Sequence, residues 1–314
     1  MSGVDFGRAG GPDHAGRWND KTEAALRTVF EAIRKHSKIA VTLQLAHAGR
    51  KASSYEPWKG GQLIPASEGG WATYAPSAVA HKEGETLPVA LSKADLHRLR
   101  DAFVASTARA VRLGVDAIEL HGGHGYLIHQ FLSPISNRRT DEYGGSLENR
   151  MRFPLEIFDA VRCALPAEKL LGIKLSACDW VEGGLDIDQT VEISRELKKH
   201  GADWIVLSSG GISPLQKIAP APNYQVPFAE RVKKETGVIS TAVGLITEAH
   251  QAEAIIASGK ADLVAIARAM LYDPRWPWHA AAELNAKVDG PPQYWRAPPT
   301  QYKDIFNHMT FGAR

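Results

Sequence analysis

The sequence predicts an α/β barrel assembled from consecutive βα units. From residue 39 onward, short apolar runs rich in Val, Ile and Leu alternate with longer amphipathic stretches, a pattern typical of parallel strands joined by helices. The 314 residues could form one large barrel or two ordinary domains, but no linker separates the repeating units. With 44% hydrophobic and 23% charged residues, the chain can bury a large core.

Six apolar runs are the predicted strands. They cover residues 39–45, 115–120, 171–176, 203–208, 238–243 and 262–267. A closed (β/α)8 barrel, the TIM barrel, needs eight strands, and this sequence supplies about six βα units. One further helix, near residues 20–36, precedes the first strand and belongs to none of these units.

The helices between the strands carry start and stop signals. Ser92 and Asp95 form a capping box at the start of a helix over 92–114. The other predicted helices cover residues 146–164, 188–200, 225–236 and 247–258. Thr247 is the expected N-cap of the last helix, and Gly259 is its expected stop.

The segment 50–90 interrupts the repeat. It is rich in Gly, Pro, Trp and Tyr and is too long for an ordinary βα loop. We expect it to fold over the end of the barrel where sites are built. The predicted organisation is therefore a single domain over 1–314 with a cap insertion at 50–90.

Charge and cysteine content exclude several classes of protein. The 37 Lys and Arg residues nearly balance 35 Asp and Glu residues, which gives no reason to expect a nucleic acid or an anionic membrane as partner. Cys163 and Cys178 are too few for a disulfide framework or an Fe–S cluster, and a cytoplasmic location is expected. The N-terminus lacks the pattern of a secretion signal, and no apolar run reaches the length of about 18 residues that a membrane span needs.

Polar residues and glycines follow the ends of successive predicted strands, where a barrel builds its site. They are Gln44, His47, His121, His124, Tyr126, Lys174, the run 208–211, Gly244 and Arg268. Those after the first three strands suit a polar ring and a carbonyl group. The small residues and the arginine after the last three suit a phosphate, because glycines let backbone N–H groups approach an anion.

Each of these signals also has a purely structural interpretation. A His-x-x-His pair such as His121 and His124 can bind a metal, but no third ligand stands at a recognisable spacing. A single glycine such as Gly244 often marks only a tight turn, and Lys174 can pair with an acid across the barrel. The functional interpretation is favoured because all these residues fall at the same end of successive strands.

Several longer motifs carry a family resemblance. The segments "LQLAHAGRKAS", "ELHGGHGYLIHQFLSPISNRRTDEYGGSLENRMRF", "KLSACDWVEGG", "VLSSGG", "AVGLIT" and the run around "LVAIARAML" resemble the old yellow enzyme family of FMN-dependent ene-reductases, in its bacterial branch with a His–His pair. The match begins near Gly16 and runs to the end of the chain. Family members carry roughly two further βα units ahead of this point, so the resemblance implies that the first two strands are lacking here.

The resemblance implies roles for the residues of the first group. His121 and His124 would hydrogen-bond the carbonyl oxygen of an α,β-unsaturated substrate, and Tyr126 would protonate its Cα. Gln44 would bond the pyrimidine edge of the flavin. Lys174 occupies the place of a family arginine that stabilises the reduced flavin, and it supplies the charge without the planar fork of arginine.

The resemblance assigns the second group to the phosphate of FMN. Ser209, Gly210, Gly244, Ala267 and Arg268 would line the ribityl phosphate, with Ala267 standing where glycine is more usual. Arg296 resembles a C-terminal arginine that reaches a neighbouring subunit's site, although a solvated tail explains it equally well. In "SNRRTDEYGGSLENR", the expected bracing residues of the loop after the His pair are Arg138, Asp141, Asn149 and Arg150, with Ser146 capping the next helix.

The leading hypothesis is an FMN-dependent oxidoreductase that takes hydride from NADPH or NADH and reduces the C=C bond of an enone-type small molecule. A homo-oligomer is compatible with it. One alternative is a non-catalytic remnant of this fold with weak or no FMN binding, and another is a metal-dependent barrel hydrolase that uses His121 and His124. The sequence leaves open the natural substrate, the preferred nicotinamide and the number of subunits.

Overall fold

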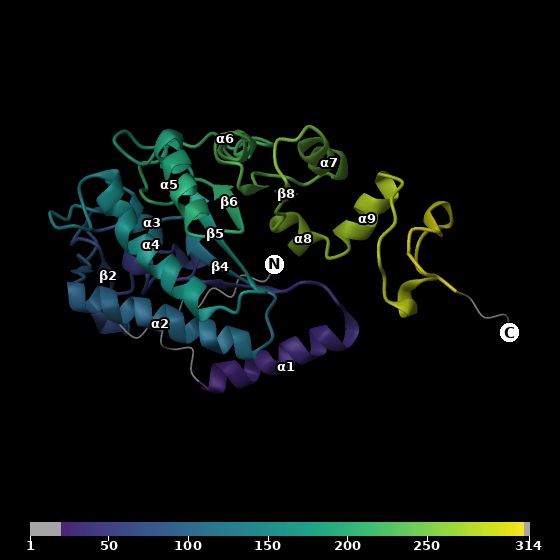
Figure 1. The fold of residues 1–314 in the computed structure, drawn as a ribbon, viewed down its shortest axis with the longest axis horizontal. Helices are drawn as coiled ribbons and strands as arrows, with labels where there is room; N and C mark the ends of the chain where they lie inside the picture. The colour runs from purple at the N-terminus through teal and green to yellow at the C-terminus, as the bar shows by residue number, and fades with distance from the viewer. Residues whose placement is uncertain (1–19, 311–314) are drawn as a thin grey trace.

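The computed structural model describes residues 20–310, and a six-stranded parallel sheet is its centre (Figure 1). The strands are β1 (Thr42–Leu45), β4 (Ala117–Gly122), β5 (Leu170–Ser176), β6 (Trp204–Ser208), β7 (Ile239–Ala242) and β8 (Leu263–Val264). They pair in chain order, so all six predicted strands are confirmed. In the described part of the chain, β1 and β8 are the two edges of the sheet, and no pairing closes it into a barrel.

The two faces of this sheet differ in chemistry because neighbouring side chains on a strand point to opposite sides. One set of alternate residues is apolar and belongs to the main hydrophobic core: Leu43, Leu45, Ile118, Leu120, Ile173, Leu175, Ile205 and Leu207. The other set includes Gln44, Glu119, His121, Lys174 and Trp204, and we call this side the inner face. The polar inner face is the surface on which a site can be built.

Helices cover the apolar face. They are α2 (Lys93–Arg112), α4 (Leu147–Ala164), α5 (Ile187–Lys199), α6 (Val226–Thr236) and α7 (Ala249–Ala257), which follow one another around one side of the sheet in Figure 1. The capping box of Ser92 and Asp95 and the N-cap at Ser146 are confirmed. The expected N-cap at Thr247 is wrong by one residue, because Glu248 takes that place and the side chain of Gln251 accepts from the backbone N–H of Thr247 at 2.9 Å.

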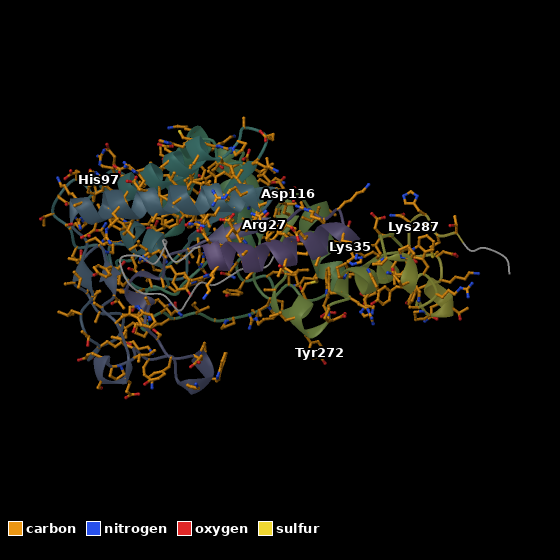
Figure 2. The ribbon with its side chains drawn as sticks, turned by 90° about the horizontal axis from the view of Figure 1, so that it is seen from below. Arg27, Lys35, His97, Asp116, Tyr272 and Lys287 are labelled. Carbon is orange, nitrogen blue, oxygen red and sulfur yellow. The ribbon has the colours of Figure 1, made fainter. Side chains whose placement is uncertain are left out.

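Helix α1 (Asp20–His36) lies beside the C-terminal end of α2. The buried carboxylate of Glu23 accepts from Arg109 at 3.0 Å and from Arg112 at 2.6 Å. Figure 2 shows Arg27 and Asp116 on this side of the molecule, and Arg27 reaches the carbonyl of Arg112 at 3.2 Å. The predicted helix 20–36 is confirmed, while the start of the motif match at Gly16 lies outside the described residues.

The segment 50–90 contains little regular structure. Its elements are η2 (Gly49–Lys51), η3 (Pro57–Lys59), η4 (Ala66–Glu68) and the short parallel pair β2 (Tyr74–Ala75) and β3 (Val89–Ala90). Arg50 donates to the carbonyl of Ile212 at 2.6 Å, and the backbone N–H of Arg138 donates to Ser77 at 2.8 Å. This segment therefore packs against the loops that follow β4 and β6.

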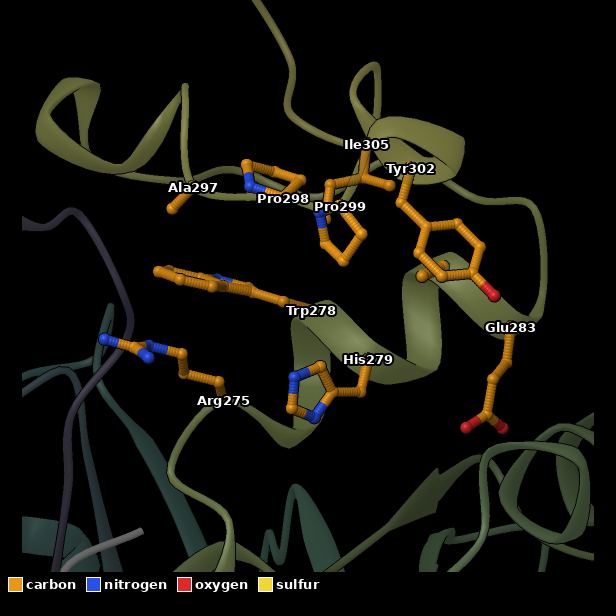
Figure 3. A pocket seen from close by; sticks show the side chains of 10 residues that line it. Arg275, Trp278, His279, Glu283, Ala297, Pro298, Pro299, Tyr302 and Ile305 are labelled. Atoms are coloured by element: carbon orange, nitrogen blue, oxygen red, sulfur yellow. The ribbon is translucent and has the colours of Figure 1, made fainter.

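The C-terminal part extends away from the sheet in Figure 1. It comprises α8 (Arg268–Tyr272), α9 (Trp276–Glu283), η5 (Pro292–Tyr294) and η6 (Thr300–Tyr302). The ring of Trp278 contacts Tyr294 and Phe306, with ring centres 5.3 and 5.0 Å apart. Beside it lies a cavity of about 300 Å³ between α9 and the 297–305 segment (Figure 3). Within residues 20–310, no helix is long and apolar enough to cross a membrane.

Candidate functional site

The two histidines and the tyrosine of the "HGGHGY" motif come together at the carboxyl end of β4. The strand ends at Gly122, and the chain turns through left-handed conformations at His124 (φ +54°) and Gly125 (φ +76°) before α3 (Leu127–Leu132) begins. The ring centre of His121 lies 5.1 Å from that of His124 and 4.9 Å from that of Tyr126. The turn thus gathers three side chains that a continuing strand would send to opposite faces.

Burial keeps both imidazoles neutral. His121 is only 5% exposed, and burial lowers its pKa well below the ordinary value, with the nearby His124 and Lys174 adding to the effect. Burial also lowers the pKa of His124 to about 3, and the positive charge of Lys174 is the next largest cause of this shift. Neutral imidazoles at physiological pH offer one N–H donor each, which suits a carbonyl oxygen.

The hydrogen bonds of this pair are incomplete. Nε2 of His124 lies 2.7 Å from the hydroxyl of Ser208, whereas Nδ1 of His121 is buried and has no hydrogen-bond partner among residues 20–310. A buried polar atom without a partner costs free energy, and a ligand can supply the missing bond. No cluster of three or more His, Cys, Asp or Glu side chains in the described chain is arranged to hold a metal ion.

A buried carboxylate below the His pair was not among the predicted site residues. Glu119 is 1% exposed, and its oxygens accept from Gln44 Nε2 at 2.6 Å and from Trp204 Nε1 at 3.2 Å. Burial raises its pKa, while the Gln44 hydrogen bond and the charge of Lys174 oppose that shift. The signal in the sequence is an acid flanked by Ile118 and Leu120 near the end of the run "GVDAIEL".

Lys174 lies opposite His121 in the strand register, on the inner face. Burial lowers its pKa, and the negative charge of Glu119 acts in the opposite direction. No ion pair within 4.0 Å joins Lys174 to an acid in the part of the chain that the structure describes. Its ammonium group is therefore a partly buried charge on the inner face.

Lys51 is a second residue that the sequence analysis missed. Its ammonium group donates to the carbonyls of His124 at 2.9 Å and Gly211 at 3.1 Å, and it lies 5.7 Å from the ring centre of Tyr126. Burial lowers its pKa to about 8, with Arg50 as the next cause. Two consecutive cations after β1, in "AHAGRKAS", were the available signal.

The residues predicted for a phosphate are only partly brought together. Gln225, which the sequence analysis missed, accepts from Ser209 at 2.7 Å, and a Cβ on Gly244 would meet its backbone nitrogen at 3.0 Å. Gly210 adopts a left-handed conformation (φ +72°) beside Ser209. Gln225 therefore joins the ends of β6 and β7.

Ala267 and Arg268 stand apart from this group. Both are exposed, Ala267 as the N-cap of α8 and Arg268 as its first residue. Among residues 20–310, no hydrogen bond or ion pair links Arg268 to Ser209, Gly210 or Gly244. Arg296 is likewise exposed, on the C-terminal part of the chain. The roles implied for these three residues stay predictions.

The loop after the His pair is braced as expected, with one correction. The buried side chain of Arg150 donates to Gln189 at 2.7 Å, and Asn149 donates to the carbonyl of Gly144 at 3.1 Å. Arg138 is exposed, and its neighbour Arg139 pairs with Asp141 instead. Arg139 also donates to the carbonyls of Pro76 and Leu91 at 3.0 and 2.6 Å, so it ties the loop to the 50–90 segment.

Comparison with known proteins identifies the family. A family model described as NADH:flavin oxidoreductase / NADH oxidase matches residues 4–287. The chain belongs to this family. An NADPH dehydrogenase of Geobacillus sp. (strain WCH70) is 42% identical over 281 residues, which cover 90% of this chain and 77% of that protein.

Solved structures agree with this assignment. Morphinone reductase in complex with tetrahydroNAD superposes with a TM-score of 0.67 at 26% identity, over 94% of this chain and 80% of that one. A 2-naphthoyl-CoA reductase complex gives 0.73 at 23% identity, over 82% of this chain but only 40% of that one, and shares the fold. The neighbours support the old yellow enzyme type of α/β fold that the sequence motifs imply.

This family member is an oxidoreductase that uses FMN and a nicotinamide nucleotide. The inner face fits a flavin ring, because it offers a carboxamide at Gln44 and an ammonium group at Lys174. The glycines after β6 and β7 leave backbone that an anion can approach. The donor set therefore agrees with the cofactor of the family.

Proposed function

We propose that the protein is an NAD(P)H-dependent ene-reductase that reduces the C=C bond of α,β-unsaturated carbonyl compounds. The observation that carries this proposal is the convergence of His121, His124 and Tyr126 at the end of β4, buried and beside the inner face. Gln44 and Lys174 would hold the ring of FMN, and the bound cofactor would supply the redox chemistry, as the carrier of hydride between the nicotinamide and the alkene.

The protein's own groups complete the reaction. His121 and His124 donate hydrogen bonds to the substrate carbonyl oxygen, which draws electron density from the alkene and stabilises the negative charge that develops there. Tyr126 delivers a proton to the α-carbon as general acid, so that hydride and proton together saturate the bond. Lys51 holds the turn that carries His124 through its hydrogen bond to the His124 carbonyl at 2.9 Å.

The cofactor contacts are part of the same proposal. Gln44 uses its amide N–H on Glu119, which leaves its carbonyl oxygen as an acceptor for the pyrimidine edge of the flavin. Lys174 supplies positive charge that favours the reduced, anionic form of the ring. The proposed phosphate contacts are Ser209, Gly210, Gly244, Ala267 and Arg268.

The organisation proposed for the chain is a single unit over 1–314 in which residues 50–90 cover the site. The contacts of Arg50 with Ile212 and of Lys51 with Gly211 support this role of the segment. Arg296 is proposed to reach the site of a second subunit in a homo-oligomer. The substrate class is an enone-type small molecule.

Reconstitution with FMN tests the proposal. Purified protein should retain FMN, bleach on addition of NADPH or NADH without oxygen, and recover its colour on addition of 2-cyclohexenone. A double His121→Ala, His124→Ala variant should retain FMN but turn over the enone at a rate lower by about 100-fold or more. His200→Ala, on the outer helices, is the control. Failure to retain FMN would favour a non-catalytic remnant, and stoichiometric zinc without flavin would favour a hydrolase.

A further inference from the structure

The backbone of the turn between His124 and Tyr126 is held by side chains of the following helix. The N–H group of Gly125 donates to Nδ1 of His129 at 2.9 Å, and the carbonyl of Gly125 accepts from Gln130 at 2.7 Å. Gly125 has φ +76° and a Cβ there would lie 2.1 Å from the carbonyl oxygen of Gly211, so the turn has little freedom to relax. Both peptide groups that flank Gly125, which stands between His124 and the proposed proton donor Tyr126, are thus clamped in place.

Behind the clamp lies a fully buried carboxylate. Nε2 of His129 is 2.8 Å from Asp179, and neither side chain is exposed to solvent. The other oxygen of Asp179 accepts from the hydroxyl of Ser133 at 2.6 Å and from the backbone N–H of Leu185 at 2.7 Å. The hydroxyl of Ser133 and the backbone N–H of Leu185 both donate to Asp179, so the group serves as a carboxylate acceptor.

These contacts determine where the proton of His129 resides. Nδ1 accepts from the N–H of Gly125, so it carries no hydrogen, and Nε2 must carry the hydrogen that points to Asp179. We propose that Asp179 and His129 are positioning residues: Asp179 selects the Nε2–H form of His129, and Nδ1 of His129 holds the Gly125 peptide so that Tyr126 and His124 face the substrate. This inference rests on the proposed function of His124 and Tyr126.

A second His–Asp pair shows what this arrangement adds. His200 lies 2.7 Å from Asp159 across α4 and α5, but both side chains are partly exposed, at 32% and 49%, and the pair contacts no residue of the site. A surface pair of this kind contributes little to stability or specificity. The His129–Asp179 pair differs from this surface pair in two ways: it is fully buried, and His129 accepts a hydrogen bond from the Gly125 peptide.

Two substitutions of His129 separate its two hydrogen bonds. The side-chain oxygen of His129→Asn can replace Nδ1 and accept from Gly125, but the residue is too short to reach Asp179. The amide nitrogen of His129→Gln can replace Nε2 and donate to Asp179, but it leaves Gly125 without an acceptor. Both variants lose one buried hydrogen bond and some packing, so a purely structural role predicts similar losses in both.

The decisive readout is the rate at which pre-reduced enzyme is reoxidised by 2-cyclohexenone. We expect His129→Asn to stay within about threefold of the wild type and His129→Gln to fall by about tenfold or more, because small displacements of reacting groups slow chemistry strongly. FMN affinity should be unchanged in both variants, and His200→Asn should behave as the wild type. Equal losses in the two His129 variants, or the reverse order, would overturn the inference.

A measurement without turnover tests the tautomer directly. Imidazole ¹⁵N shifts of the full chain, with and without FMN, should show Nδ1 of His129 unprotonated and Nε2 protonated, and Asp179→Asn should disturb this pattern. A protonated Nδ1 in the wild type would overturn the inference. Should the wild type fail to reduce the enone, the proposed function fails, while the tautomer still decides whether Asp179 selects the form of His129.

Discussion

At the scale of single residues, burial sets the chemistry of the site. His121 and His124 stay neutral because they are removed from water next to the positive charge of Lys174. A neutral imidazole whose pKa is this low keeps the same protonation state, and so the same single N–H donor, throughout the physiological pH range. The same burial lowers the pKa of Lys51 to about 8, so the lysine that holds the turn is itself poised to titrate.

The shifted histidines predict that the protein loses stability in acid. Burial lowers the pKa of His124 to about 3 and that of His81 to about 4, against 6.5 in an unfolded chain, and it also lowers the pKa of His121 well below 6.5. Above 6.5 all three are neutral in both states and contribute no pH dependence. Below it the unfolded chain binds protons that the native state refuses, so unfolding becomes easier as pH falls through this window.

Urea unfolding at several pH values between about 7.5 and 5 measures this effect. We expect the free energy of unfolding to fall by about 1.4 kcal/mol per fully buried histidine for each pH unit below 6.5, and by less for the more exposed His81. The double variant His121→Asn, His124→Asn should show a flatter curve. An identical pH dependence in variant and wild type would contradict the prediction.

The conformation of Gly125 gives a second prediction at this scale. Gly125→Ala places a Cβ 2.1 Å from the carbonyl oxygen of Gly211 at φ +76°. Gly183→Ala is the matched control, since φ is +70° there and nothing lies within 4 Å of the added atom. We expect a loss of about 1 kcal/mol at Gly183 from strain alone and at least about 3 kcal/mol at Gly125, measured by urea unfolding. Similar losses at both glycines would show that the clash is relieved.

At the scale of elements, one row of side chains links four strands across the inner face. Gln44, Glu119, Gly172 and Trp204 are consecutive partners in the register of β1, β4, β5 and β6. Because Gly172 has no Cβ, the indole of Trp204 lies across β5 and reaches Glu119 at 3.2 Å. The carboxylate that holds Gln44 is thereby held from the other side.

Gly172→Ala tests this row. The new Cβ would lie 2.1 Å from the Trp204 ring, so the indole must move and Glu119 loses a donor. We expect a loss of about 2–4 kcal/mol for overpacking together with the unsatisfied acid. For Trp204→Phe, which removes the donor but keeps a smaller aromatic ring, we expect about 1–2 kcal/mol. FMN affinity should fall more in Gly172→Ala. Wild-type stability of that variant in urea would contradict the packing argument.

At the scale of the whole molecule, the hydrophobic interior is divided unequally. The main cluster of buried residues runs from Phe30 to Ala261 and joins all the covering helices to the sheet. The buried residues Phe306 and 280–282 lie outside it. Phe306 contacts the ring of Trp278, and Ala282 lines the cavity that Figure 3 shows. Tyr272, on the connecting helix α8, is 94% exposed and points outward in Figure 2.

This division predicts that the C-terminal part opens before the rest. Hydrogen exchange measured by mass spectrometry should show amides in 285–310 exchanging well before those of β4 to β6, because few buried apolar contacts hold them. Trp278→Ala should speed exchange in 285–310 and leave that of the central strands unchanged. Coincident exchange of both parts would show that the molecule opens as a single unit.

The fold could be predicted in outline because its signals are local. The six strands, the helix starts at Ser92 and Ser146 and the helix 20–36 all follow from patterns within a few residues. The prediction of β8 over 262–267 is too long, since pairing with β7 extends only over Leu263–Val264. The run "DLVAIA" is apolar enough for a strand, but only its partner decides where pairing stops.

The candidate site divides in the same way. The sequence could identify His121, His124 and Tyr126 because they lie in one short motif, "HGGHGY". The family resemblance also came from short motifs of this kind. Three contacts of the site could not be predicted, because each depends on strand register, on a missing Cβ or on the path of a loop. They are Glu119 with Trp204, Lys51 with Gly211 and Ser209 with Gln225. Periodicity records which face a residue occupies, whereas the distance between two side chains on different strands is decided only when the sheet assembles.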